Sequence, residues 1–208
     1  MRRRSIFITI SHLKKSVFST FELASLSGKS LSVTTQALNN LVKDGLVEKI
    51  YRGIWAKTKD ERVSPYLLIP YLFTKSRAYV SFVSALHLYG IIEQIPQVIY
   101  LASLSHTKVI RTKIGVFSVH QITPSLFDGF KWYRETGDFL IAEQEKALVD
   151  SLYLSGYKKK QFGSFPELNF PRSFSFKKAN EWVKKIPNLK IKTHVQQKLN
   201  TLSKISVK

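Results

Sequence analysis

The sequence predicts an α+β protein in which an N-terminal winged helix-turn-helix is followed by a mixed α/β C-terminal domain. Two observations support this prediction. Residues 5–57 combine three short helical patterns with a tight hairpin, and residues 65–156 alternate apolar strand-like runs with helical segments. The chain has 208 residues, of which 44% are hydrophobic, so it is long enough to bury a substantial core.

Three helices are expected near the N-terminus, and serine, threonine and glycine residues mark their ends. Ser19 and Thr20 are suited to cap the second helix, Ser32 is suited to cap the third, and Gly45 is placed to end it. The expected helices span residues 5–15, 21–27 and 32–44.

Two tight turns complete this predicted module. The sequence Gly28-Lys29-Ser30 indicates a turn between the second and third helices. Arg52-Gly53 indicates a second turn, which joins expected strands over residues 46–50 and 54–57. This hairpin is the predicted wing, and its flanking Tyr51 and Trp55 are expected to pack rather than to stack on bases.

The third helix has two different faces at about 100° per residue. One face is expected to pack on the first two helices and carries Val33, Thr34, Ala37, Leu38, Leu41 and Val42. The opposite face carries short polar side chains and one lysine, namely Ser32, Thr35, Gln36, Asn39 and Lys43, with Asn40 at its edge.

This polar face suits the recognition of a DNA duplex. Amide side chains such as those of Gln36 and Asn39 can donate and accept together at adenine N6 and N7 in the major groove. Hydroxyl groups suit phosphates at a helix N-terminus, and basic arms can follow a groove. A solvated helix face is the alternative, but the preceding turn and the basic hairpin favour DNA binding. The candidate DNA-binding residues are Arg2, Arg3, Arg4, Lys29, Ser32, Thr35, Gln36, Asn39, Asn40, Lys43 and Arg52.

Positive charge is concentrated at the two ends of the chain. Lys and Arg number 33 against 14 Asp and Glu, which gives a formal net charge of +19. Residues 1–62 carry a net charge of +7, residues 63–156 carry +1 and residues 157–208 carry +11. Such an excess indicates a polyanionic partner, of which nucleic acid is the commonest, although a solvated basic surface is the alternative.

The second predicted domain spans residues 63–208, after a DNA-binding domain over residues 1–62 and a polar segment before Pro65. Helices are expected over residues 65–74 and 81–89, and strands over residues 98–103, 114–121 and 139–142. A further helix is expected over residues 143–154. In it Ala147, Leu148 and Leu152 face inward, whereas Glu145, Lys146 and Asp150 are expected to face water, with Lys146 and Asp150 pairing at the surface.

The basic tail over residues 157–208 is expected to contain helices over residues 174–185 and 189–203. Its lysines indicate further phosphate contacts, an acidic protein or RNA partner, or only a solvated face above packed aromatic residues. The candidate polyanion-binding or partner-binding residues are Lys158, Lys159, Lys160, Lys177, Lys178, Lys184 and Lys185.

Several function classes receive no support from the sequence. The absence of cysteine excludes a disulfide scaffold, a thiolate zinc site and a cysteine nucleophile. The five histidines lack helical metal-ligand spacing, and neither a phosphate-binding loop nor a nuclease carboxylate pattern is present. We therefore expect no enzymatic activity, metal or cofactor. No apolar run reaches the roughly 18 residues of a spanning helix, so we expect no membrane partner and a cytoplasmic location.

The middle region carries Ser84-Ala85-Leu86 and the Glu145-Lys146-Ala147-Leu148-x-Asp150 stretch, behind the predicted winged helix. With this arrangement the chain resembles the AbiEi family, whose members are antitoxins of type IV abortive-infection toxin–antitoxin systems. The resemblance extends from about residue 5 to residue 155 and is weakest in the basic tail.

The resemblance implies a two-domain autorepressor that binds inverted repeats of double-stranded DNA in its own promoter. Its C-terminal domain would counter a nucleotidyltransferase-like toxin without a stable complex, and its DNA-reading residues would be Ser32, Thr35, Gln36, Asn39, Lys43 and Arg52. Two alternatives remain: an interaction protein that binds a toxin or RNA through residues 157–208, and a ligand-responsive transcription factor with a pocket in residues 65–156.

Overall fold

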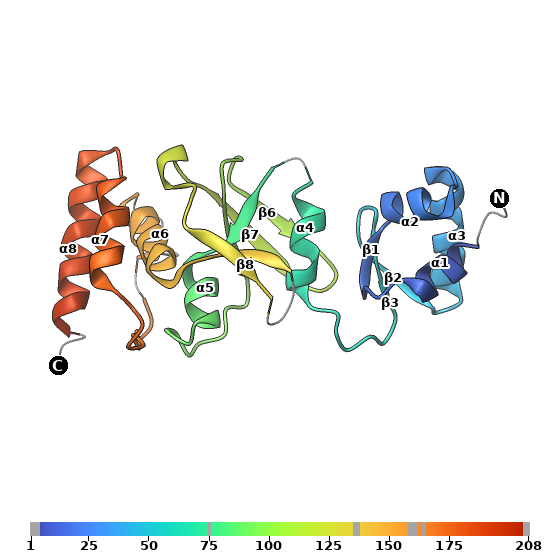
Figure 1. Ribbon diagram of the computed structural model, residues 1–208, viewed down its shortest axis with the longest axis horizontal. Coiled ribbons are helices and arrows are strands. Elements are labelled where there is room, and N and C mark those ends of the chain that lie inside the picture. The colour runs from blue at the N-terminus through green and yellow to red at the C-terminus, as the bar shows by residue number, and fades with distance from the viewer. Residues whose placement is uncertain (1–4, 75, 135–137, 158–161, 164, 206–208) are drawn as a thin grey trace. The chain divides into compact units, whose positions relative to one another are not determined.

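The computed structural model describes residues 5–74, 76–134, 138–157, 162–163 and 165–205. The protein has a mixed α+β fold in which helices and a three-stranded antiparallel sheet come first, and a six-stranded mixed sheet and C-terminal helices follow (Figure 1). The chain forms two compact units. Unit 1 comprises residues 1–74 and 111–115, and unit 2 comprises residues 75–110 and 116–208. The expected domain division after residue 62 stays a prediction.

Unit 1 begins with helices α1 (Ile6–His12), α2 (Thr20–Ser27) and α3 (Leu31–Lys43). Each helix starts after a serine, namely Ser5, Ser19 and Ser30, whose Oγ accepts a backbone N–H of the first turn and so satisfies a donor that lacks a partner within the helix. The expectation that Ser32 caps α3 is wrong, because the chain is still extended at Ser30 and Ser32 already lies in the helix. Gly28 ends α2 with a φ of +66°, which favours glycine.

The sheet of unit 1 has the order β1-β3-β2 and contains β1 (Val17–Ser19), β2 (Val47–Tyr51) and β3 (Ile54–Lys57). Gly53, with a φ of +69°, turns the chain between β2 and β3. Strand β1 was not expected, because three residues are too short to show an alternating pattern. The core beneath the helices consists of Ile6, Ile10, Phe18, Leu23, Leu38, Val47 and Trp55.

Trp55 links this sheet to α2. Its side chain is buried, as expected, and its indole Nε1 donates a hydrogen bond to Thr20 Oγ1 at 2.8 Å. Tyr51 is half-buried. The chain then leaves the sheet and forms a 3-10 turn (Pro65–Leu68) and the short helix α4 (Ile69–Leu72), where a single helix was expected.

The sheet of unit 2 has the order β6-β7-β5-β4-β9-β8. Strands β5 and β7 are parallel, as are β4 and β9, whereas β4 is antiparallel to β5 and β8 is antiparallel to β9. Strands β5, β7 and β9 confirm the expected ones, and the three short strands β4, β6 and β8 were missed. The strands are β4 (Ala78–Val80), β5 (Ile99–Ser103), β6 (Lys108–Arg111), β7 (Val116–Gln121), β8 (Phe130–Tyr133) and β9 (Phe139–Ala142).

Helix α6 (Gln144–Gly156) lies in the middle of unit 2. It contacts α5 (Phe82–Leu88), α7 (Phe176–Lys184) and α8 (Leu189–Ile205). Figure 1 shows α6 between the sheet and the pair formed by α7 and α8. This central position buries ten consecutive residues of α6, from Glu145 to Leu154. Among the described residues, no helix has the length and apolar character needed to cross a membrane.

Candidate nucleic-acid interface

The buried face of α3 fixes which of its side chains point outward. Thr34 and Leu38 are fully buried against the core of unit 1, and Ala37 and Leu41 are partly buried. The side chains exposed on the rest of the helix include those of Ser32, Gln36, Asn39, Asn40 and Lys43. All five were predicted to bind DNA. Because they belong to one helix, their positions relative to one another are fixed.

The buried stripe of α3 is narrower than expected. Val33 and Val42 were expected to pack inward, but their side chains are 48% and 38% exposed. The arc that contains Ala37, Leu41, Thr34 and Leu38 reaches the core, and Val33 and Val42 lie just beyond its two edges. This correction widens the outward face on both sides.

The outward face is centred on Ser32, Gln36 and Lys43. At about 100° per residue, these three residues fall within an arc of about 40° opposite the buried stripe. Asn39 and Asn40 lie on opposite sides of this arc, and Asn40 is toward the edge of the exposed face. Thr35 is half-buried, and its Oγ1 donates to the Leu31 carbonyl at 2.8 Å, so its hydroxyl hydrogen is used within the helix.

The amide side chains on this face are available to a ligand. Within the described part of the chain, the side chains of Gln36, Asn39 and Asn40 make no hydrogen bond to another residue. Each can therefore donate and accept at a base edge without breaking a contact in the protein.

Basic side chains lie near both ends of this surface. Lys29 is half-buried in the turn before α3, Lys43 is the last residue of α3, and Arg52 is exposed in the turn between β2 and β3. The N-terminal end of α3 also carries the positive end of the helix dipole, which favours an anion such as a phosphate. Arg2, Arg3 and Arg4 lie outside the described residues, as do Lys158, Lys159 and Lys160.

Most of the described candidate lysines in the tail have acidic partners within unit 2. Lys178 Nζ lies 3.0 Å from Glu143 Oε2, and this contact raises the pKa of Lys178. Lys184 Nζ lies 2.7 Å from Glu181 Oε1. Lys185 Nζ lies 3.8 Å from Asp128 Oδ2 and 3.9 Å from the centre of the Trp182 ring. Lys177 is exposed. The surface is thus partly neutralised by the protein's own carboxylates.

A second polar cluster lies inside unit 2, where none was expected. Lys146 and Asp150 form an ion pair one turn apart on α6, and both side chains are fully buried. Lys146 Nζ also donates to Tyr79 Oη at 3.0 Å, and Ser81 Oγ donates to Asp150 Oδ2 at 2.7 Å. Tyr79 Oη donates in turn to Asp150 Oδ2 at 3.1 Å. We call Tyr79, Ser81, Lys146 and Asp150 the buried network.

Burial changes the proton affinities of this network. Loss of water lowers the pKa of Lys146, although the neighbouring Asp150 carboxylate opposes this shift. Burial also raises the pKa of Tyr79 well above its usual value, and the same carboxylate adds to that effect. The expectation that Glu145, Lys146 and Asp150 face water is therefore wrong. A usable signal was present, because apolar residues occur on all sides of residues 147–154, as is typical of a buried helix.

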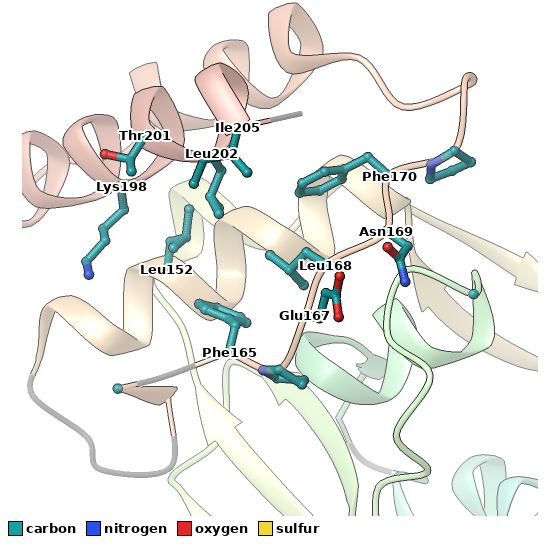
Figure 2. A pocket seen from close by; sticks show the side chains of 14 residues that line it. Leu152, Phe165, Glu167, Leu168, Asn169, Phe170, Lys198, Thr201, Leu202 and Ile205 are labelled. Carbon is teal, nitrogen blue, oxygen red and sulfur yellow. The ribbon is translucent and has the colours of Figure 1, made fainter. Parts of the chain in front are cut away.

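A cavity of about 990 Å³ lies beside α6. Figure 2 shows Leu152 of α6, Leu168 of the segment before α7, and Leu202 of α8 converging on it. A second cavity of about 360 Å³ is lined by residues that include Thr107, Pro124 and Tyr153. Only the second lies within the region in which the ligand-responsive alternative expected a pocket.

The histidines do not form a metal site in the part of the chain that the structure describes. His120 is buried, as expected for a core residue, and its Nε2 lies 2.9 Å from Ser118 Oγ. His87 is half-buried, with Nδ1 at 3.1 Å from the Ile92 carbonyl oxygen. Among the described residues, no group of three or more His, Asp or Glu side chains is arranged to hold a metal ion.

The outward face of α3 carries exposed amides, and its chemistry suits the edges and phosphates of a nucleic acid. No protein-family model matches this chain, and no curated protein matches its sequence.

Proposed function

We propose that the chain binds double-stranded DNA in a sequence-specific manner and that residues 5–57 act as a winged helix-turn-helix. Helix α2, the turn at Gly28 and α3 would form the helix-turn-helix, and the β2–β3 hairpin would be the wing. In this arrangement α3 enters the major groove and Arg52 contacts a phosphate or the adjacent minor groove.

One observation carries this proposal. The exposed face of α3 holds Gln36 near its centre and Asn40 about 40° away, two amides whose side chains make no hydrogen bond within the described residues. Buried Thr34 and Leu38 on the opposite side hold the helix in place. A rigid helix that presents free amides between basic side chains is suited to direct reading of base edges.

The resemblance to AbiEi antitoxins suggests the biological setting. We propose that the protein represses its own operon in the cytoplasm by binding inverted repeats in the promoter. Unit 2 would counter a nucleotidyltransferase-like toxin without forming a stable complex with it. The buried network then has a structural role, since its members are hydrogen-bonded to one another.

The DNA-binding proposal is tested by titrating a fluorescent duplex of the promoter upstream of the chain's own gene with the full chain. A scrambled duplex of the same composition measures nonspecific binding. Replacing Gln36→Ala together with Asn40→Ala should weaken promoter binding by roughly 30-fold or more, because each bidentate amide contact contributes about 1–3 kcal/mol. Binding to the scrambled duplex should change little and should remain sensitive to salt.

A matched control exists in unit 2. Gln197→Ala together with Asn200→Ala removes the same two kinds of side chain from the exposed surface of α8. This variant should bind the promoter as the unmodified chain does. The proposal fails if the chain shows no preference for the promoter, or if both double variants lose affinity equally.

The antitoxin part of the proposal needs a separate readout. A nucleotidyltransferase-like gene next to this one would be expressed alone, with the unmodified chain, or with the Gln36→Ala/Asn40→Ala variant, all from promoters that the protein does not control. Both forms of the chain should restore growth, because the substitutions lie in unit 1. Failure of the unmodified chain to protect the cells would contradict the antitoxin role while leaving DNA binding intact.

A further inference from the structure

Val33 is an exposed apolar side chain at the edge of a polar surface. Its side chain is 48% exposed, although the helix it belongs to buries Thr34 next to it. The backbone N–H of Val33 donates to Ser30 Oγ at 3.3 Å, and this cap holds the residue in the first turn of α3. A β-branched side chain in a helix is also nearly confined to one rotamer, so Val33 offers its two methyl groups to solvent in a fixed direction.

Val33 shares a stripe with the exposed amides of Gln36 and Asn40. Val33, Gln36 and Asn40 fall within an arc of about 60°, at positions i, i+3 and i+7 of the helix. Neighbours three apart have Cβ atoms about 5–6 Å from each other, whereas successive nucleotides of one strand are about 3.4 Å apart along the duplex axis. Side chains at Val33 and Gln36 can therefore contact the same base pair or adjacent pairs.

The chemistry of this stripe favours A·T pairs over G·C pairs. An amide binds adenine N6 and N7 in a bidentate manner, and the paired thymine presents its C5 methyl group in the same groove. An apolar side chain beside an amide therefore matches both halves of an A·T pair or of two adjacent ones. Helix α3 contains no arginine, the residue that most often reads guanine, and its single lysine is its last residue.

We propose that Val33 contacts the methyl group of a thymine next to an adenine that is read by Gln36 or Asn40, so that each operator half-site contains an A·T-rich core. This inference rests on the proposed DNA binding and specifies the bases that are read. An exposed valine could instead belong to a protein interface with the exposed Leu31. Leu31 lies about 160° from Val33 around the helix, so the two do not form one patch on α3.

The experiment first selects binding sites for the full chain from a pool of randomised duplexes. The selected half-sites should share an A·T-rich core. Each thymine of that core is then replaced singly by uracil, which removes only the C5 methyl group and preserves base pairing. At one thymine per half-site we expect affinity to fall roughly fourfold, as the loss of one buried methyl contact predicts.

Two variants of α3 assign the methyl contact. Val33→Ala should weaken binding to the thymine duplex by a similar factor and should bind the thymine and uracil duplexes equally. Val42→Ala is the matched control, because Val42 is also partly exposed but lies about half a turn away from Val33. That variant should keep the full sensitivity to uracil.

The outcomes separate the two proposals. If the selection yields a defined site but no uracil substitution depends on Val33, the methyl contact is wrong and the proposed DNA binding stands. The same holds if the core is G·C-rich, or if Val33→Ala changes the oligomeric state and leaves base preference unchanged. If no defined site is selected, the proposed function and this inference are both overturned.

Discussion

Helices α3 and α6 have the same length, 13 residues, but their polar side chains have opposite surroundings. On α3 the outward amides Gln36 and Asn40 are exposed. On α6 the polar pair Lys146 and Asp150 is fully buried. The difference comes from the neighbouring elements. One side of α3 packs against the rest of unit 1, whereas α6 is contacted by α5, α7 and α8.

The comparison separates polar groups that have hydrogen-bond partners within the protein from polar groups that remain available to a ligand. A buried charge must be paired within the protein, and Lys146 has Asp150 and Tyr79 for that purpose. The amides of α3 lack such partners in the described part of the chain. The polar groups of α6 therefore stabilise the fold, while those of α3 can bind a ligand.

The largest effect is expected on stability, when one partner of the buried Lys146–Asp150 ion pair is removed. Lys146→Met should lower the free energy of unfolding by about 3–5 kcal/mol, because Asp150 would remain buried without its cationic partner. Urea denaturation of the full chain, followed by circular dichroism, measures this loss. Lys177→Met is the control: Lys177 is exposed, and its substitution should change stability by less than about 0.5 kcal/mol.

A double variant shows whether the loss reflects an unpaired charge. Lys146→Met combined with Asp150→Leu removes both charges and should recover part of the stability, since apolar replacements of a buried ion pair are often tolerated. Recovery should be incomplete, because Tyr79 and Ser81 would lose their acceptor. A loss of less than about 1 kcal/mol for Lys146→Met alone would contradict the structural role of the network.

The next largest effect is expected on DNA affinity and compares the contributions of the neighbouring residues Asn39 and Asn40 of α3. Asn40→Ala should weaken specific DNA binding by about 10- to 100-fold, because Asn40 lies on the stripe of Gln36 and Val33 and can make a bidentate base contact. Asn39→Ala should cost less than about threefold, because Asn39 lies on the other side of Gln36 from that stripe. Titrations of the selected duplex with both variants measure the two effects.

Thermal unfolding of the same two variants provides the control. Both side chains are exposed, so neither substitution should change stability by more than about 0.5 kcal/mol. A larger effect of Asn39→Ala than of Asn40→Ala on specific affinity would mean that the bases are read by the side of α3 that carries Asn39 and not by the stripe of Val33, Gln36 and Asn40.

The local pattern of residues was sufficient to predict most of unit 1. Serine caps, the glycine at position 28 and the turn at Arg52-Gly53 act through their nearest neighbours in sequence, so the expected helices and hairpin agree closely with α2, α3, β2 and β3. The error at Val33 arose because periodicity gives the direction of a face but not the width of the surface that contacts it.

The errors in unit 2 have a different cause. Whether Lys146 faces water depends on α7 and α8, which lie more than 25 residues further along the chain, and the pattern of residues 147–154 indicates burial without naming the elements that cause it. Strands β4 and β8 show too few alternations to be recognised, whereas all four residues of β9 are apolar. Packing between elements far apart in the sequence therefore determined the features of unit 2 that local propensity did not predict.

The smallest expected effect compares one basic side chain from each unit. Arg52→Ala should reduce the slope of log affinity against log salt by about 1, because one phosphate contact and its released counterion are lost. The change should be the same on specific and scrambled duplexes, since a phosphate contact carries no base information. Lys184→Ala should leave the slope unchanged, because Lys184 already pairs with Glu181 in unit 2. Equal changes in slope for the two variants would show that DNA also contacts the basic helices of unit 2. They would also show that a lysine with an acidic partner in the protein can still contact phosphate.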